Sequence, residues 1–110
     1  MKYIPGDKIP VTLAHNMIPR KALIKVGDSK TNLQTINDAY LKAGQFFLPH
    51  IHNDSEEIYY FLEGRGIISI DKKEIDIKQG DCILIEAGES HGLKNTGINS
   101  LRFITIRTHS

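Results

Sequence analysis

A series of short β-prone segments, separated by turns, constrains the fold of this chain more than any other feature. Such segments lie at residues 57–62, 67–70, 74–77 and 82–85, and turns such as Gln79-Gly80-Asp81 separate them. No stretch of ten residues or more shows sustained helical periodicity. Many short strands with Gly- and Asp-containing turns are typical of an all-β sandwich or barrel, which is the fold class we predict.

Length and charge narrow the class of protein. A chain of 110 residues forms one domain with a single core, and 40% hydrophobic and 25% charged residues are ordinary globular values. The net charge is +1 and no Lys/Arg run exceeds two residues, so we expect no nucleic-acid partner. The chain has no apolar leader and no apolar segment of membrane-spanning length, which predicts a cytoplasmic protein without a membrane partner.

We expect residues 1–21 to form an N-terminal arm and residues 22–110 to form the β-barrel domain. The arm holds three of the four prolines and shows little periodicity, apart from one possible short strand near residues 11–13. In the domain, residues 67–70 and 74–77 flank a polar loop and predict a hairpin. The single cysteine, Cys82, cannot form an intrachain disulfide and is interpreted as a small buried residue.

Two histidines and a carboxylate near the middle of the chain suggest a metal site. His50 and His52 are two residues apart on a predicted strand, so their side chains point to the same face. On a helix they would lie on nearly opposite sides. A short turn can return Glu57 to the same place, although the neighbouring Glu56 competes for this role. Imidazole and carboxylate groups together suit a transition metal.

A fourth possible donor, His91, follows the predicted strand 82–85 and a glycine-containing turn. In a compact barrel, this turn and the region of His50 and His52 can face each other across the interior. His91 would then complete a set of three imidazoles and one carboxylate, with positions left for water or substrate.

These residues closely resemble the two sequence motifs of the cupin family. The first motif has the form Gly, five residues, His-x-His, three or four residues, Glu, six residues, Gly, and it is matched by Gly44, His50, His52, Glu57 and Gly64. The second motif has the form Gly, five residues, Pro-x-Gly, two residues, His, three residues, Asn, and it is matched by Gly80, Gly88, His91 and Asn95. One position departs from the pattern, because Glu86 stands where the family usually has proline. This departure puts the rigidity of the turn in question rather than the ligands.

The resemblance implies a double-stranded β-helix, or jelly-roll barrel, that holds one divalent transition metal per chain. The metal would be Mn, Fe, Zn or Ni, with His50, His52, Glu57 and His91 as ligands, and the motif spacing favours Glu57 over Glu56. By strand alternation, Tyr59 and Phe61 are expected on the side of Glu57, and Phe46 and Leu48 on the side of the two histidines, as an apolar pocket wall or as plain core.

The family includes sugar isomerases, dioxygenases, decarboxylases and lyases, so the resemblance implies a small-molecule ligand without choosing a reaction. We expect a small metalloenzyme of isomerase or dioxygenase type that acts on an oxygen-rich sugar or organic acid derivative. Glu56, Tyr59 and Glu89 are candidate general bases by position alone. The alternative is a non-catalytic binding module. The resemblance also implies a homodimer, in which the arm would reach the partner.

Three other polar residues are not expected in the site. His15 lies in the arm, where nothing nearby completes a cluster. His109 is next to the C-terminal residue and is expected in a frayed tail. Arg65 lies between two glycines and is expected to be exposed in a turn.

Overall fold

The computed structural model describes residues 1–14 and 17–109, which form ten strands after one short 3-10 turn, η1 (Gly6–Lys8). The strands are β1 (Val11–Ala14), β2 (Ile18–Ile24), β3 (Leu33–Leu41), β4 (Phe46–Ile51), β5 (Ser55–Glu63), β6 (Arg65–Ile70), β7 (Lys73–Lys78), β8 (Cys82–Ile85), β9 (Ser90–Asn95) and β10 (Leu101–His109). Within this part of the chain, no helix is long and apolar enough to cross a membrane.

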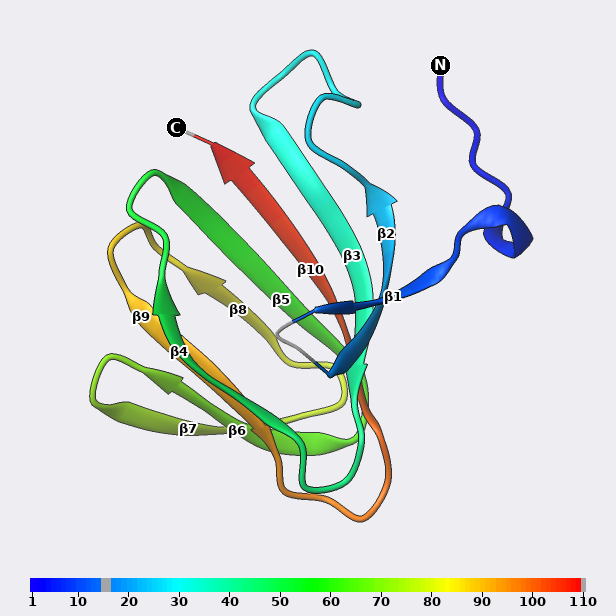
Figure 1. Cartoon of the computed structure of the whole chain (residues 1–110). Coiled ribbons are helices and arrows are strands. Elements are labelled where there is room, and N and C mark those ends of the chain that lie inside the picture. Colours follow the sequence, from blue (N-terminus) through cyan, green and yellow to red (C-terminus); the bar gives the residue numbers. More distant parts are fainter. Residues whose placement is uncertain (15–16, 110) are drawn as a thin grey trace.

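The strands form two antiparallel sheets that face each other (Figure 1). The larger sheet has the order β1-β2-β3-β10-β5-β8, and the smaller sheet has the order β4-β9-β6-β7. The chain passes from one sheet to the other several times, so that strands distant in sequence become neighbours, as β3 and β10 do. This arrangement confirms the predicted all-β jelly-roll barrel.

Several strand predictions are also confirmed. β6 and β7 form the expected hairpin, in which Ile70 pairs with Lys73 across the Asp71-Lys72 loop. β1 coincides with the short strand expected near residues 11–13. β2, however, begins at Ile18, and its pairing of Arg20 with Ala39 joins part of residues 1–21 to the larger sheet.

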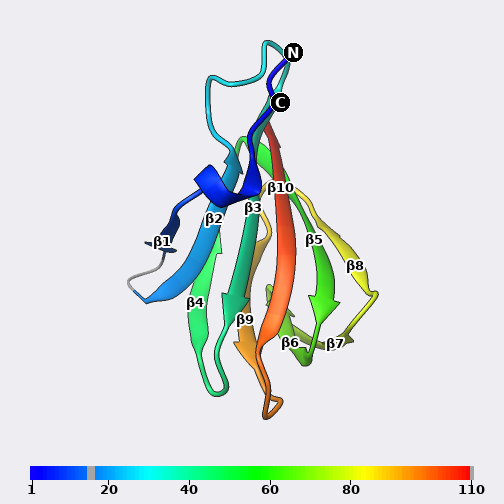
Figure 2. The ribbon, with the colours of Figure 1, turned by 90° about the vertical axis from the view of Figure 1, so that its right-hand side faces the viewer.

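The hydrophobic core lies between the sheets, because alternate side chains of each strand point inward. Thirteen buried apolar side chains form one cluster: Ile18, Ala39, Leu41, Phe47, Tyr59, Phe61, Ile68, Ile70, Ile77, Ile85, Leu93, Leu101 and Phe103. Figure 2 shows the strands of the larger sheet running side by side, with those of the smaller sheet behind them.

The prediction that Cys82 is buried is wrong. In β8 the inward positions are Ile83 and Ile85, and Cys82 is exposed on the other face, where it pairs with the exposed Tyr60. β8 is an edge strand with one solvated face, so an apolar run in the sequence did not mean burial of every residue in it.

The prediction of a frayed tail at His109 is also wrong. β10 extends to His109, whose backbone N–H donates to the carbonyl of Asn32 at 2.7 Å and whose ring forms an ion pair with Asp54 at 3.5 Å. These contacts lie outside the predicted metal site. Arg65 is exposed, as expected, but it is the first residue of β6 and does not lie in a turn. His15 falls outside the described residues.

Candidate metal centre

An irregularity in β4 determines which of its side chains face the interior. Phe47 pairs with Leu93 and His50 pairs with His91, so β4 has one more residue than β9 between these pairs, at a β-bulge that contains Pro49. Phe47 and His50 therefore both face inward.

The bulge overturns one sequence expectation. Phe46 and Leu48 do not form a pocket wall beside the histidines, because their side chains are 57% and 73% exposed. Phe47 is buried in their place and lines the interior. Simple alternation fails here because it assumes an uninterrupted strand.

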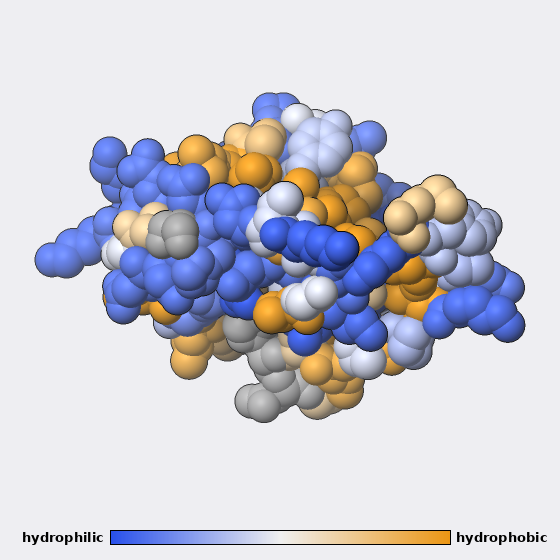
Figure 3. Space-filling view, turned by 90° about the horizontal axis from the view of Figure 1, so that it is seen from above, coloured by the Kyte–Doolittle hydropathy of each residue, from blue (hydrophilic) through white to orange (hydrophobic). Residues whose placement is uncertain are grey.

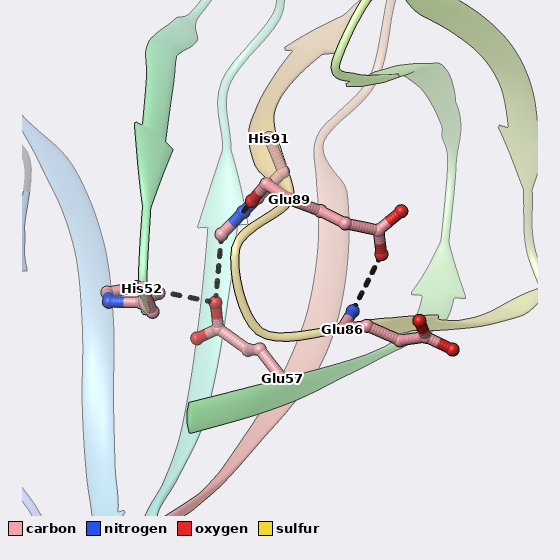
Figure 4. Close-up of polar contacts among 5 residues, drawn as sticks. All are labelled: His52, Glu57, Glu86, Glu89 and His91. Carbon is pink, nitrogen blue, oxygen red and sulfur yellow. Dashed lines mark hydrogen bonds and ion pairs between the residues drawn. The ribbon is translucent and has the colours of Figure 1, made fainter. Parts of the chain in front are cut away.

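The structure brings together the four predicted metal ligands. His50, on β4, and His52, just after it, face His91 at the start of β9 and Glu57 on β5, and one donor atom from each lies within 4.8 Å of the others. Glu57 Oε1 lies 3.1 Å from His91 Nε2 and 3.8 Å from His52 Nε2 (Figure 4). Glu56, the competing glutamate, is exposed and outside this group.

The turn before β9 lacks the family's usual proline and is held by hydrogen bonds instead. The backbone N–H of Glu86 donates to Glu89 Oε1 at 2.7 Å, and the N–H of Glu89 donates back to the Glu86 carbonyl at 3.1 Å (Figure 4). Proline has no N–H and would remove the first bond. Gly88, with φ +89°, donates its N–H to the carbonyl of His52 at 2.9 Å. The turn is thus held by hydrogen bonds within itself and by one hydrogen bond to the first motif.

The same turn orients His91. Nδ1 of His91 lies 3.1 Å from the backbone carbonyl of Glu89, an acceptor that fixes the proton on Nδ1 in the neutral ring. Nε2 then points toward Glu57 and is available as a metal ligand. A backbone carbonyl behind a histidine is a common means of setting ring orientation at metal sites.

The charges of the four residues are coupled. Burial by itself raises the pKa of Glu57, but the hydrogen bond from His91 and the positive charge of the histidines outweigh it and hold the pKa below its usual value. Burial lowers the pKa of His91, and the contacts with Glu57 and the Glu89 carbonyl outweigh this and raise it. Burial lowers the pKa of His52, and Glu57 only partly offsets that effect.

The three candidate general bases occupy different positions. Glu56 is exposed, and the carboxylate of Glu89 accepts the hydrogen bond within its own turn. Tyr59 is buried on the inner face of β5, and its ring centroid lies 6.2 Å from that of His91. Burial, together with the charge of Glu57, raises the pKa of Tyr59 well above 10, so this phenol keeps its proton at neutral pH.

A cavity of about 470 Å³ lies beside the cluster and contains part of it in its wall. His50, His52 and Glu57 line one part of the cavity, and the inner faces of β2, β3 and β10 line another. This volume is within the range of ligand sites, roughly 300–1,000 Å³.

Sequence reasoning missed two arginines in the cavity wall, Arg20 and Arg107. Alternation along β10 gives a signal for the second, because Leu101, Phe103 and Thr105 are the inward positions that precede it. Arg20 belongs to the segment expected to be an irregular arm.

The donor set suits a divalent transition metal. Three imidazoles and one carboxylate are nitrogen and oxygen ligands of the type that Mn, Fe, Ni and Zn accept, and four protein ligands leave positions open in a six-coordinate site. The lowered pKa of Glu57 keeps this ligand ionised, and the hydrogen bond at Nδ1 leaves Nε2 as the nitrogen of His91 that would bind a metal in place of a proton.

The fold and the site together define a class: small jelly-roll proteins that carry a possible metal site. The two antiparallel sheets face each other, and three histidines and a carboxylate lie together on their inner wall. The chain belongs to the cupin family: the family described as "Cupin domain" matches residues 38–107. This match spans both motifs and all four clustered residues.

Several known proteins are similar to this chain. An oxalate-binding protein of Thermotoga maritima is 40% identical over 57 residues, which cover 52% of this chain and 47% of that protein. Acireductone dioxygenase of Tuber melanosporum is 36% identical over 69 residues, or 56% of this chain and 39% of that protein. The chain thus spans about half or less of the length of these relatives. A crystal structure described as a predicted oxalate decarboxylase from T. maritima has a TM-score of 0.90 and 25% identity, covering 99% of this chain and all of that one.

Proposed function

We propose that this protein is a metal-dependent cupin that binds a small oxygen-rich organic ligand and acts on it as an enzyme. The observation that carries the proposal is the position of the four-residue cluster beside a cavity of ligand size, with three of its members in the cavity wall. His50, His52, Glu57 and His91 would hold one divalent metal, with Mn, Fe, Zn and Ni as the candidates. Such a metal supplies Lewis-acid or redox chemistry at the positions that the protein ligands leave open.

The protein's own residues define the conditions of the reaction. The His91 ring is fixed by the Glu89 carbonyl, and the turn that holds it is closed by the Glu86–Glu89 hydrogen bond, so the donor geometry is set before a ligand enters. Tyr59 keeps its proton and lines the cavity, where its hydroxyl is suited to donate a hydrogen bond to a ligand oxygen.

Between the two reaction types, the side chains favour a dioxygenase-like over an isomerase-like reaction. Isomerisation through an enediolate needs a general base near the substrate. Of the three candidates, Glu56 is exposed, Glu89 is engaged in its turn and Tyr59 is protonated, so none is a ready base. The similarity to an acireductone dioxygenase supports this preference.

A second candidate function is metal-dependent binding without turnover. The similarity to an oxalate-binding protein favours it, and the same lack of a ready base is consistent with it. A ligand such as oxalate would be held through its oxygens in either case.

The test begins with the metal content of protein purified without chelators, measured by elemental analysis. We expect close to one equivalent per chain in the wild type and a loss of at least 90% in the His50→Ala/His52→Ala double variant, because two of four ligands are absent. Phe46→Ala, at an exposed position on the same strand, is the matched control and should keep its metal. Equal metal content in the double variant and the wild type would contradict the site.

The second step separates the enzyme from the binding module. Metal-loaded protein is incubated with oxalate, uronates, sugar phosphates and 1,2-diketones, and both turnover and heat of binding are measured. Turnover that disappears in Glu57→Ala supports catalysis. Saturable binding of a ligand that is recovered unchanged supports the binding module instead.

We also propose a homodimer, with residues 1–21 contacting the partner. Several exposed apolar side chains lie on edge strands of the sheets, where Val11 and Leu13 on β1 and Phe46, Leu48 and Ile51 on β4 are more than half exposed. Surfaces of this kind commonly become buried in interfaces. Sedimentation equilibrium tests this: a mass equal to the 12.4 kDa of one chain would contradict the dimer.

A further inference from the structure

The cavity beside the metal cluster has an excess of positive charge. Its charged lining residues, apart from the histidines, are Arg20, Lys25, Arg107 and Glu57. Glu57, the single carboxylate among them, is already in contact with His91 and His52. Two of the three cations, Arg20 and Arg107, are partly buried, and Lys25 is exposed.

Arg107 lies directly beside the metal cluster. It is the register partner of Glu57, so the two side chains leave the larger sheet on the same face from adjacent strands, with Cβ atoms about 5 Å apart. It is close enough for its charge to lower the pKa of His52. Nevertheless, among the described residues Arg107 forms no salt bridge, and its Nε is buried without a hydrogen-bond partner.

Arg20 occupies a more distant part of the same wall. Arg20 on β2 pairs with Ala39 on β3, and Ala39 pairs with Phe103 on β10. Paired residues point to the same face, so Arg20 points inward like Phe103, two strands away from β10. Its Nε is also buried without a hydrogen-bond partner. The small side chains of Ala22 and Ala39 leave room in front of it, and both line the cavity.

Two guanidinium groups with buried, unused donors are costly for the protein alone. The cost is recovered when an anion enters, because arginine forms paired, charge-assisted hydrogen bonds with carboxylates. The face seen from above Figure 1 is largely hydrophilic, with smaller hydrophobic patches between the polar side chains (Figure 3). A polar surface of this kind suits entry of a charged solute better than of an apolar one.

We propose that the ligand of this protein is a small organic dianion. The metal cluster would hold one carboxylate with its neighbouring oxygen, and Arg107 and Arg20 would bind the second carboxylate across the cavity. This inference rests on the proposed function, because it deepens the description of the same site. It assigns the substrate class to hydroxy or oxo dicarboxylates, including diacid forms of sugars, rather than to neutral sugars.

The test compares matched pairs of acids that differ only in the second carboxylate: 2-oxoglutarate with 2-oxopentanoate, and malate with 2-hydroxybutanoate. Their dissociation constants are measured by titration calorimetry with metal-loaded protein. In at least one pair we expect the diacid to bind about tenfold more tightly or better. Equal affinities within both pairs would overturn the proposal.

Variants then assign the effect to the arginines. Arg107→Gln and Arg20→Gln should each reduce diacid affinity at least about tenfold and leave monoacid affinity within about twofold. Arg102→Gln is the matched control on β10, because Arg102 lies on the outer face and is paired with Asp38. A diacid affinity unchanged in Arg107→Gln, or reduced equally in Arg102→Gln, would overturn the assignment.

Metal content, measured in every sample, separates the two proposals. A wild-type protein that binds no metal contradicts the proposed function by itself, whatever the calorimetry shows. A wild-type protein that holds its metal but binds diacids and monoacids equally contradicts only the dianion. The three arginine variants are expected to keep wild-type metal content, since none of them supplies a ligand.

Discussion

The inner face of the larger sheet has two ends of opposite character. Along β3 the inward residues change from Leu41 and Ala39 at one end to Asn37 and Thr35 at the other, and β10 and β5 change in the same direction. On β10 the inward residues run from Leu101 and Phe103 to Thr105 and Arg107, and on β5 they run from Phe61 through Tyr59 to Glu57. We call the apolar end, with Leu101 and Leu41, the packed end, and the polar end, with Arg107 and Glu57, the open end.

This difference shows how one sheet serves two purposes. At the packed end, side chains of both sheets meet and bury apolar surface, which stabilises the barrel. At the open end the same strands carry polar side chains around a cavity, and the metal cluster lies there. Because the strands are continuous, the packed end fixes the backbone from which the open end projects its ligands.

The largest expected effect is a loss of unfolding free energy when a side chain is truncated at the packed end rather than at the open end. Phe61 is fully buried at the packed end, so Phe61→Ala should lower the free energy of unfolding by about 3–5 kcal/mol. Asn37→Ala, at the open end of the same sheet, should change the free energy of unfolding by less than about 1 kcal/mol. Urea unfolding of both variants measures this. An Asn37→Ala variant as unstable as Phe61→Ala would remove the distinction between the ends.

A smaller effect concerns the polar exception at the packed end. Asn95 is 1% exposed, donates from Nδ2 to the carbonyls of Leu41 and Asn99, and accepts from the N–H of Gly97. Asn95→Ala leaves these groups without their partner and should cost about 1–3 kcal/mol of unfolding free energy. Asn99→Ala is the control, since it retains the backbone carbonyl. A neutral Asn95→Ala would show that water replaces the amide.

The next effect is a pH dependence at the open end, in metal-free protein. The folded-state pKa of His91 lies above 6.5 because its contacts with Glu57 outweigh burial. A raised pKa means that His91 contributes stability fully below pH 6.5, and that this contribution is lost as the pH rises through the folded-state pKa. Glu57→Gln removes the negative charge, leaves the effect of burial and should bring the pKa of His91 down.

Two measurements check the pH dependence. NMR titration of the His91 ring should give a lower pKa in Glu57→Gln than in the wild type. In unfolding experiments between pH 6 and 8, the wild type should lose stability relative to Glu57→Gln as the pH rises. Identical pH profiles for the two proteins would mean that Glu57 and His91 are not coupled.

Much of the fold and of the cluster could be predicted because the information is local. Short strands and turns are visible as patterns of a few residues, and the spacing from Gly44 to Gly64 and from Gly80 to Asn95 identifies two motif regions. The pairing of His50 with His91 then follows from the barrel, where these regions are neighbours.

The remaining features depend on register between distant strands, which a single sequence does not determine. Because of the bulge that contains Pro49, Phe47 lies on the inner face, where strand alternation predicted Phe46 and Leu48. The place of Arg107 beside Glu57 depends on the β10–β5 register, because alternation along β10 marks Arg107 as an inward residue but does not say which residue of β5 it faces. The Glu86–Glu89 hydrogen bond is a local feature, but it became interpretable only once the turn geometry was known.

The smallest expected effect is at Cys82, on the outer face of the larger sheet. This is the face opposite the one that carries the packed end and the open end. A buried cysteine would lose packing and gain a hydroxyl that needs a partner when replaced by serine. Cys82 is exposed on an edge strand, so Cys82→Ser should change the free energy of unfolding by no more than about 0.5 kcal/mol. For the same reason, the native protein should react with a thiol reagent at the rate of its unfolded form, within about tenfold. Protection of the thiol until the protein unfolds would show that this face is covered, and the exposed outer face of β8 would then belong to an interface.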